Sequence, residues 1–104
     1  MAQFDVYPNP VEEVRDSHPF VVSIQSSLLK RPVSVITVAL GRLDAQRGPP
    51  STLNPWLTVV DETLVLETLI ITSFEPSDLR RPVANVGDQA PVIWDALEYA
   101  LHGY

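Results

Sequence analysis

Proline divides this chain more strongly than any other residue type. Ten prolines are spread through 104 residues and leave few stretches that are long enough for a helix. Proline removes a backbone donor and clashes with the preceding helical turn, so most of these stretches must be strands or loops. Segments 8–19 and 44–55 each hold three prolines and predict long loops. The chain is therefore expected to be mostly β.

The segments between the prolines carry strand patterns. Residues 2–7 and 20–29 alternate apolar and polar side chains, as half-buried strands do. Residues 33–43 are rich in β-branched side chains and predict a central strand. Residues 56–72 predict two strands that meet at Asp61-Glu62. Because this pair is not Asn-Gly or Asp-Gly, we expect a turn of more than two residues.

A helix is predicted only at the end of the chain, after a turn, a short strand and a further turn over 74–86. Asp88 is a candidate N-cap, Pro91 suits the first turn, and Gly103 suits the stop. The apolar positions recur at spacings of three and four: Ile93, Ala96, Leu97, Ala100 and Leu101. Residues 1–104 should thus form a single domain, with five or six antiparallel strands in a twisted sheet or barrel that the helix closes.

Charge and composition exclude several classes of function. The net charge of −6 disfavours binding along a nucleic-acid backbone, and the absence of cysteine excludes disulfides and thiolate metal sites. Basic residues pair at Lys30-Arg31 and Arg80-Arg81, each before a proline; these are solvated turn ends or a local partner patch. No apolar run has membrane-spanning length and no signal-peptide pattern opens the chain, so we expect a cytoplasmic protein.

The chain also lacks the residue patterns of an enzyme. Its two histidines, His18 and His102, lie in no metal-binding motif, which disfavours a zinc site. The pairs Glu12-Glu13 and Asp61-Glu62 are adjacent, and adjacent strand residues face opposite ways, so neither makes a working carboxylate pair. The four glycines form no phosphate-binding loop. We therefore expect no catalytic residue, no metal and no cofactor.

Several short motifs together resemble the CcdB family of plasmid-borne and chromosomal toxins. They are QFDVY, FVVSIQSSLL, LNPWLTVVDE, PVANV and a terminal HGY, in the family's order and spacing over nearly the whole chain. The resemblance implies an SH3-like barrel with a C-terminal helix and a homodimer built around that helix. It also implies a non-enzymatic toxin that poisons DNA gyrase by trapping it on cleaved DNA, and that a CcdA-type antitoxin neutralises.

The resemblance also implies which residues meet gyrase. In the family the last three residues enter the gyrase A dimer; here they are His102, Gly103 and Tyr104. Gly103 matches the family pattern. His102 stands where the family usually has tryptophan, and Tyr104 stands where it has isoleucine.

Further surfaces follow from the same resemblance. The antitoxin-binding positions are Leu28, Leu29, Glu98 and Leu101. One exposed leucine in Leu28-Leu29 is physically reasonable, and the alternative is that both are core residues at a bend. Because so apolar a helix would expose a large patch on a monomer, we expect a homodimer, with an interface of Trp94, Leu97, Ala100 and Leu101. Trp94 is otherwise a core residue, and Trp56 belongs to the core or its rim.

Two other functions remain open. Toxins of the MazF and Kid type share the barrel but cut messenger RNA, and Arg42, Arg47 and Arg80 could contribute to such a site. Alternatively, the changed tip residues His102 and Tyr104 mark a plain interaction protein that keeps the fold and has lost or changed its gyrase target.

Overall fold

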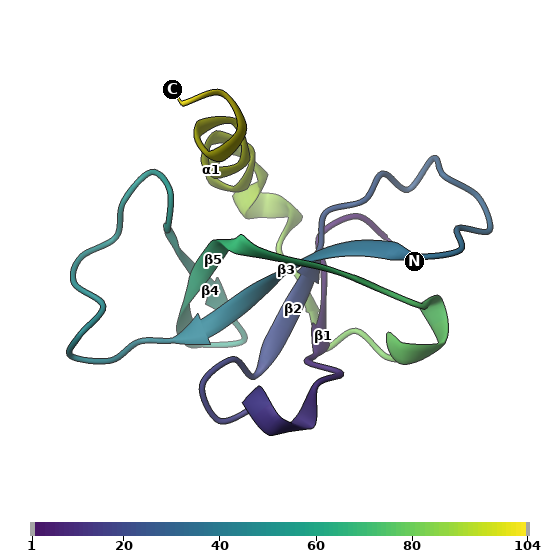
Figure 1. Ribbon diagram of the computed structural model, residues 1–104, viewed down its shortest axis with the longest axis horizontal. Coiled ribbons are helices and arrows are strands. Elements are labelled where there is room, and N and C mark those ends of the chain that lie inside the picture. The colour runs from purple at the N-terminus through teal and green to yellow at the C-terminus, as the bar shows by residue number, and fades with distance from the viewer. Residues whose placement is uncertain (1, 104) are drawn as a thin grey trace.

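The fold is one antiparallel sheet that curls into a nearly closed barrel, with a helix across it (Figure 1). The computed structural model describes residues 2–103. The strand order is β4-β5-β3-β2-β1-β6. The strands are β1 (Asp5–Pro8), β2 (Phe20–Ser23), β3 (Val35–Arg42), β4 (Trp56–Val59), β5 (Glu62–Phe74) and β6 (Ala84–Asn85). The helix α1 spans Ala90–His102, and short 3-10 turns η1, η2 and η3 span Glu12–Val14, Pro76–Asp78 and Gly87–Gln89. The predicted β barrel with a C-terminal helix is confirmed.

A glutamine side chain links the two edges of the sheet. The amide of Gln89 accepts the Thr58 N–H and donates to the Thr58 carbonyl oxygen, each at 2.9 Å. Thr58 lies on edge strand β4, and Gln89 follows edge strand β6. The side chain thus takes the place of a neighbouring strand.

The predicted N-cap at Asp88 is wrong, because Asp88 lies inside η3 and the helix begins after Gln89 without a side-chain cap.

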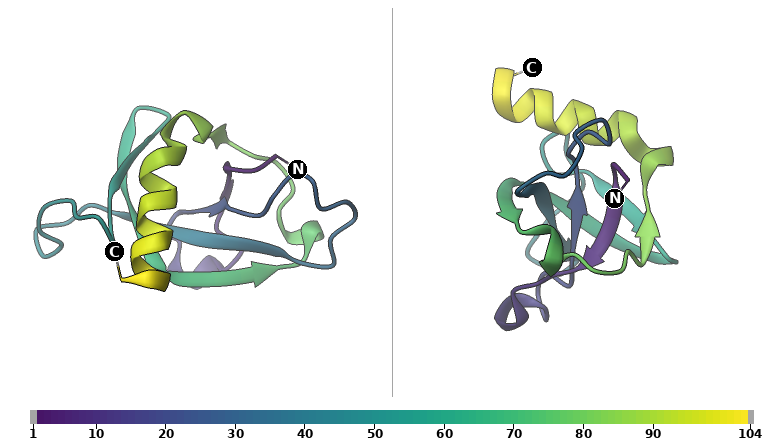
Figure 2. Two further views of the ribbon diagram at one scale, coloured as in Figure 1. Left: turned by 90° about the horizontal axis from the view of Figure 1, so that it is seen from above. Right: turned by 90° about the vertical axis from the view of Figure 1, so that its right-hand side faces the viewer.

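The main core lies between the sheet and α1. The helix buries Ile93, Ala96 and Leu97 against sheet residues that include Val38 and Leu40. Figures 1 and 2 show α1 passing over β3 and β5. A smaller cluster fills the other side of the sheet, with Tyr7, Val21, Val35 and Leu79. The sheet is therefore buried on parts of both faces, so the strands that alternate apolar and polar residues in the sequence contribute to two clusters.

Strand β5 bulges in its middle. Val38 of β3 pairs with Ile71 and the next residue, Ala39, pairs with Glu67, so residues 68–70 have no partner on β3. The buried hydroxyl of Thr68 donates to the carbonyl oxygen of Leu53 at 2.5 Å, which ties the predicted long loop to the barrel. The bulge also leaves the next two side chains, Leu69 and Ile70, exposed.

Two predicted boundaries are wrong. The turn between β4 and β5 consists of two residues, Val60 and Asp61, both with positive φ, rather than the longer turn expected at Asp61-Glu62. Strand β2 ends at Ser23. Beyond it the Gln25 side chain donates to the Ser34 carbonyl oxygen at 3.0 Å and accepts the Ile36 N–H at 3.1 Å.

Within residues 2–103, no helix is long and apolar enough to cross a membrane.

Candidate interaction surface beside the C-terminal helix

One flank of α1 is exposed and largely apolar. Trp94, Glu98 and Leu101 follow one another at spacings of four and three, so they lie on one side of the helix. Leu101 is 74% exposed. The Trp94 ring packs edge-on against Phe4, with ring centroids 5.5 Å apart, and remains half-exposed. Trp94 is therefore both a core contact and a surface residue.

Two isoleucines continue this apolar surface onto the sheet. Ile71 pairs with Val38, and directly paired residues point to the same side of a sheet. Val38 belongs to the core under α1, so Ile71 and Ile36, two residues before Val38, also face the helix side. Both are half-exposed, because α1 covers only part of β3 and β5 (Figure 2). These isoleucines were not predicted as surface residues, because only the strand register shows which face of the sheet they share.

The uncovered half of the sheet lies between α1 and the segment 24–34 (Figure 1). Leu28 is 84% exposed and Leu29 is also exposed, so the alternative of two core leucines is wrong. The segment is held by Gln25 and by a hydrogen bond from the Gln3 N–H to the Ser27 hydroxyl at 2.9 Å. Both leucines are thus presented on an anchored loop.

The helix ends in a left-handed glycine. Gly103 has φ +82° and its N–H donates to the Tyr99 carbonyl oxygen at 2.8 Å. This conformation favours glycine, as the predicted stop requires. His102 is the last helical residue, and Tyr104 lies outside the described residues. The end of α1 reaches past the barrel (Figures 1 and 2).

The four helix positions expected at a dimer interface differ in accessibility. Leu97 is only 7% exposed and packs in the core, so its side chain offers little surface to a partner. Ala100 is half-buried, while Trp94 and Leu101 are exposed. Trp56 is half-exposed at the rim of the sheet.

A buried ionic cluster that was not predicted lies under the long loop over 44–55. The Nη1 atom of Arg47 forms an ion pair with Glu67 Oε1, and His18 Nε2 lies 3.7 Å from the same oxygen. Gly41 leaves room for it, because a Cβ there would lie 2.7 Å from an Arg47 nitrogen. No spacing in the sequence links these residues, which come from a loop after β1, a loop after β3 and strand β5.

The cluster anchors the loop over 44–55 to strand β5. About four-fifths of the Arg47 and Glu67 side chains are buried, and the pair neutralises itself. Burial, and then the charge of Arg47, lower the pKa of His18, which favours the neutral ring. Of the arginines weighed for RNA cutting, Arg80 lies apart from Arg42. Arg42 ends β3 and pairs with Glu62 at 2.6 Å, while Arg80 follows the end of β5 that pairs with the start of β3. Residues 2–103 also contain no cluster of three potential metal ligands.

Comparison with known protein families agrees with this fold. The search of curated proteins gave no match to this chain. A family profile described as "CcdB protein" matches residues 3–103. That match extends over almost the whole barrel and helix. The chain therefore belongs to the CcdB family, a family of toxins from toxin–antitoxin systems.

Proposed function

We propose that this protein is a toxin that binds DNA gyrase A through its C-terminal tip and traps the cleaved DNA complex. The observation that supports this most is the end of α1, where Gly103 stops the helix in a left-handed conformation beyond the barrel. His102 and Gly103 are both exposed at this end of the helix. The proposed action is non-catalytic, as expected for a member of the CcdB family, which is a family of non-catalytic toxins. Gyrase acts in the cytoplasm, so the toxin acts there too.

The tip residues differ from those usual in the family, and this changes how they would bind. A neutral His102 ring can stack on an arginine of gyrase with less area than an indole, whereas a protonated ring would repel it. Tyr104 supplies a second aromatic ring two residues later. Together they can replace the contact that a tryptophan gives.

The same helix supports two further partnerships. A CcdA-type antitoxin would cover Leu28, Leu29, Glu98 and Leu101, which border the uncovered half of the sheet. A second copy of the chain would pack against Trp94, Ala100 and Leu101 and the adjacent isoleucines, with Leu97 supporting them from the core.

A gyrase cleavage assay tests the proposal. Purified protein should convert supercoiled plasmid to trapped linear DNA in the presence of gyrase and ATP. Deletion of residues 102–104 should abolish this product, because the tip makes the gyrase contact. Circular dichroism and antitoxin binding of the same truncated protein serve as controls and should be nearly unchanged. Trapping that survives the deletion would disprove the role of the tip.

A second candidate function is antitoxin pairing without gyrase binding. It is favoured by one observation, the histidine and tyrosine at positions 102 and 104. The double substitution His102→Trp and Tyr104→Ile separates the two functions. A wild-type protein that traps no DNA, together with a double variant that also traps none, would favour the interaction protein.

A further inference from the structure

The segment 24–34 is basic in an acidic protein. The chain has a net charge of −6, but no aspartate or glutamate occurs between Asp16 and Asp44. Within this stretch Lys30 and Arg31 are adjacent and exposed. Among residues 2–103, neither side chain forms an ion pair. Their charge is therefore available to an external group.

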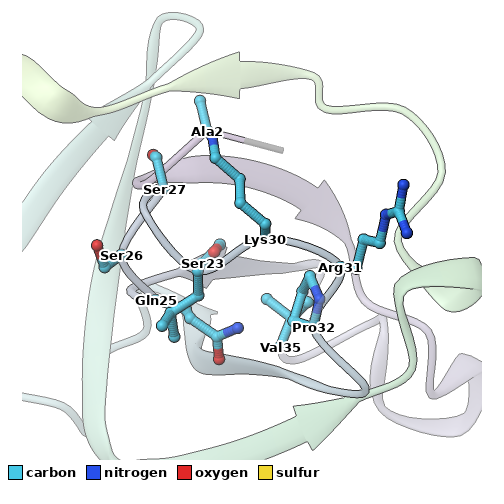
Figure 3. Close-up of a pocket in the computed structure, with 10 residues that line it drawn as sticks. Ala2, Ser23, Gln25, Ser26, Ser27, Lys30, Arg31, Pro32 and Val35 are labelled. Carbon is cyan, nitrogen blue, oxygen red and sulfur yellow. The ribbon is translucent and has the colours of Figure 1, made fainter.

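These two cations border a hollow of about 420 Å³ (Figure 3). Its lining includes Ser26, Ser27 and Leu29 and contains no acidic residue. Figure 3 shows Ser26 and Ser27 on one side and Arg31 on the other, with the guanidinium turned outward. A carboxylate here would lie near the serine hydroxyls and the two cations and would meet no other carboxylate.

Exposed aliphatic side chains flank the two cations. Leu28 and Leu29 precede them, and Val33, which is 90% exposed, follows them. Arg31 has φ +50°, although it precedes a proline, and a residue in that position normally adopts an extended conformation. The loop thus holds its apolar and cationic side chains together in a backbone conformation that a free chain avoids.

The other basic pair lacks this combination. Arg80 and Arg81 border a hollow that Glu12 and Asp78 also line, and the Arg80 Nε donates to the Ser77 carbonyl oxygen at 3.4 Å. Nearby carboxylates therefore offset part of their charge. This pair provides a matched control, since it is also followed by a proline.

We propose that Lys30 and Arg31 determine which antitoxin this protein accepts, by selecting a partner segment that carries carboxylates beside aliphatic side chains. This inference rests on the proposed toxin function. The aliphatic side chains fit Leu28, Leu29 and Val33, while the carboxylates meet the two cations. A protein segment fits better than a nucleic acid, because residues 24–34 contain no aromatic ring on which a base could stack.

Calorimetric titration with a purified CcdA-type antitoxin tests the inference. The variant Lys30→Glu/Arg31→Glu should bind about 30-fold more weakly at 50 mM salt, with a flatter salt dependence than wild type. The control Arg80→Glu/Arg81→Glu has the same change in net charge and should lose less than about threefold. Gyrase trapping by both variants should match that of wild type, which also confirms that they fold.

A reversed-charge antitoxin provides a rescue test. Replacing its acidic residues by lysine should restore binding to Lys30→Glu/Arg31→Glu and weaken binding to wild type. Equal losses in the two toxin variants, or no loss in either, would overturn the inference and leave the proposed function intact. If the wild type binds duplex DNA and Lys30→Glu/Arg31→Glu does not, segment 24–34 binds nucleic acid rather than an antitoxin, and the inference is wrong. If the wild type does not bind the antitoxin at all, the proposed antitoxin partnership fails and the inference fails with it.

Discussion

Two glutamine side chains act as substitutes for strand backbone in this barrel. Gln25 pairs with Ser34 and Ile36 where β2 has ended, and Gln89 pairs with Thr58 across the open edge. A primary amide carries both a donor and an acceptor, so it can satisfy an N–H and a carbonyl oxygen as a peptide would. Single residues therefore complete a sheet that strand pairing leaves unfinished.

Substitution of Gln89 by glutamate should destabilise the protein. The carboxylate has nearly the same shape but loses the donor, so it repels the Thr58 carbonyl oxygen. The bonds are exposed, and we expect a loss of about 1 kcal/mol in the free energy of unfolding, measured by urea denaturation. Gln46→Glu is the matched control, because the side chain of exposed Gln46 forms no hydrogen bond within the described residues. Equal effects of the two variants would contradict a barrel-closing role.

His18 should make stability depend on pH. Burial and Arg47 lower its pKa in the folded state below the ordinary value of 6.5. Between 6.5 and this lowered value, the unfolded chain binds a proton that the folded protein does not. The contribution to stability is therefore complete above pH 6.5 and is lost as the pH falls through this window.

The variant His18→Gln isolates this effect. It cannot titrate, so its free energy of unfolding should fall less than that of wild type between pH 7.5 and about 5. Chemical denaturation at a series of pH values measures the slope, and His102→Gln controls for the loss of an imidazole elsewhere. A His18→Gln slope equal to that of wild type would show that proton binding at His18 is not linked to folding.

At the scale of secondary-structure elements, the important feature of α1 is the left-handed glycine, Gly103, at which it ends. Gly103→Ala forces a side chain into the left-handed region, at a cost of about 1 kcal/mol. The last turn should then fray and the tip should point elsewhere, so gyrase trapping should weaken about fivefold. Gly48→Ala carries the same conformational cost at φ +72°, in the long loop, and should leave trapping unchanged. Equal weakening by both variants would argue against a role for the helix stop.

The sequence predicts elements well where local pattern decides them. The helix, the central strand β3 and the loop over 44–55 follow from periodicity and prolines. The β4–β5 turn does not, because Val60 disfavours a positive φ and only strand pairing on both sides holds it there. The bulge in β5 was also unpredictable, since the pairing of Thr68 with the loop is a long-range contact.

The same limit applies to sites across the whole molecule. The tip and Leu28-Leu29 remain predictions, which were possible because a family resemblance marks these positions along the chain. Ile36, Ile71 and Glu67 were missed, because their roles depend on register and on loops that meet only in the folded barrel. Segment 24–34 lies between these cases: its charges are visible in the sequence, but only the structure shows that Lys30 and Arg31 form no ion pair within residues 2–103.

The apolar surface beside α1 predicts self-association. Leu101 lies one turn beyond buried Leu97, and Ile71 lies on the same side of the sheet, so a second copy can cover both. In a two-fold dimer each substitution acts twice. Leu101→Asp or Ile71→Asp would bury an unpaired carboxylate in both protomers and should raise the dimer dissociation constant at least about 100-fold.

Sedimentation equilibrium measures this directly. Wild-type protein should sediment at twice the chain mass of 11.5 kDa, and both variants should shift toward the chain mass. Leu43→Asp is the control, because Leu43 is exposed just after β3 at the end away from segment 24–34. The thermal midpoint of the wild type should also rise with protein concentration, and those of the two variants should not, since only association links stability to concentration. A wild-type protein that stays monomeric at about 100 µM, where a dimer of ordinary affinity is fully formed, would assign this surface to the antitoxin or gyrase alone.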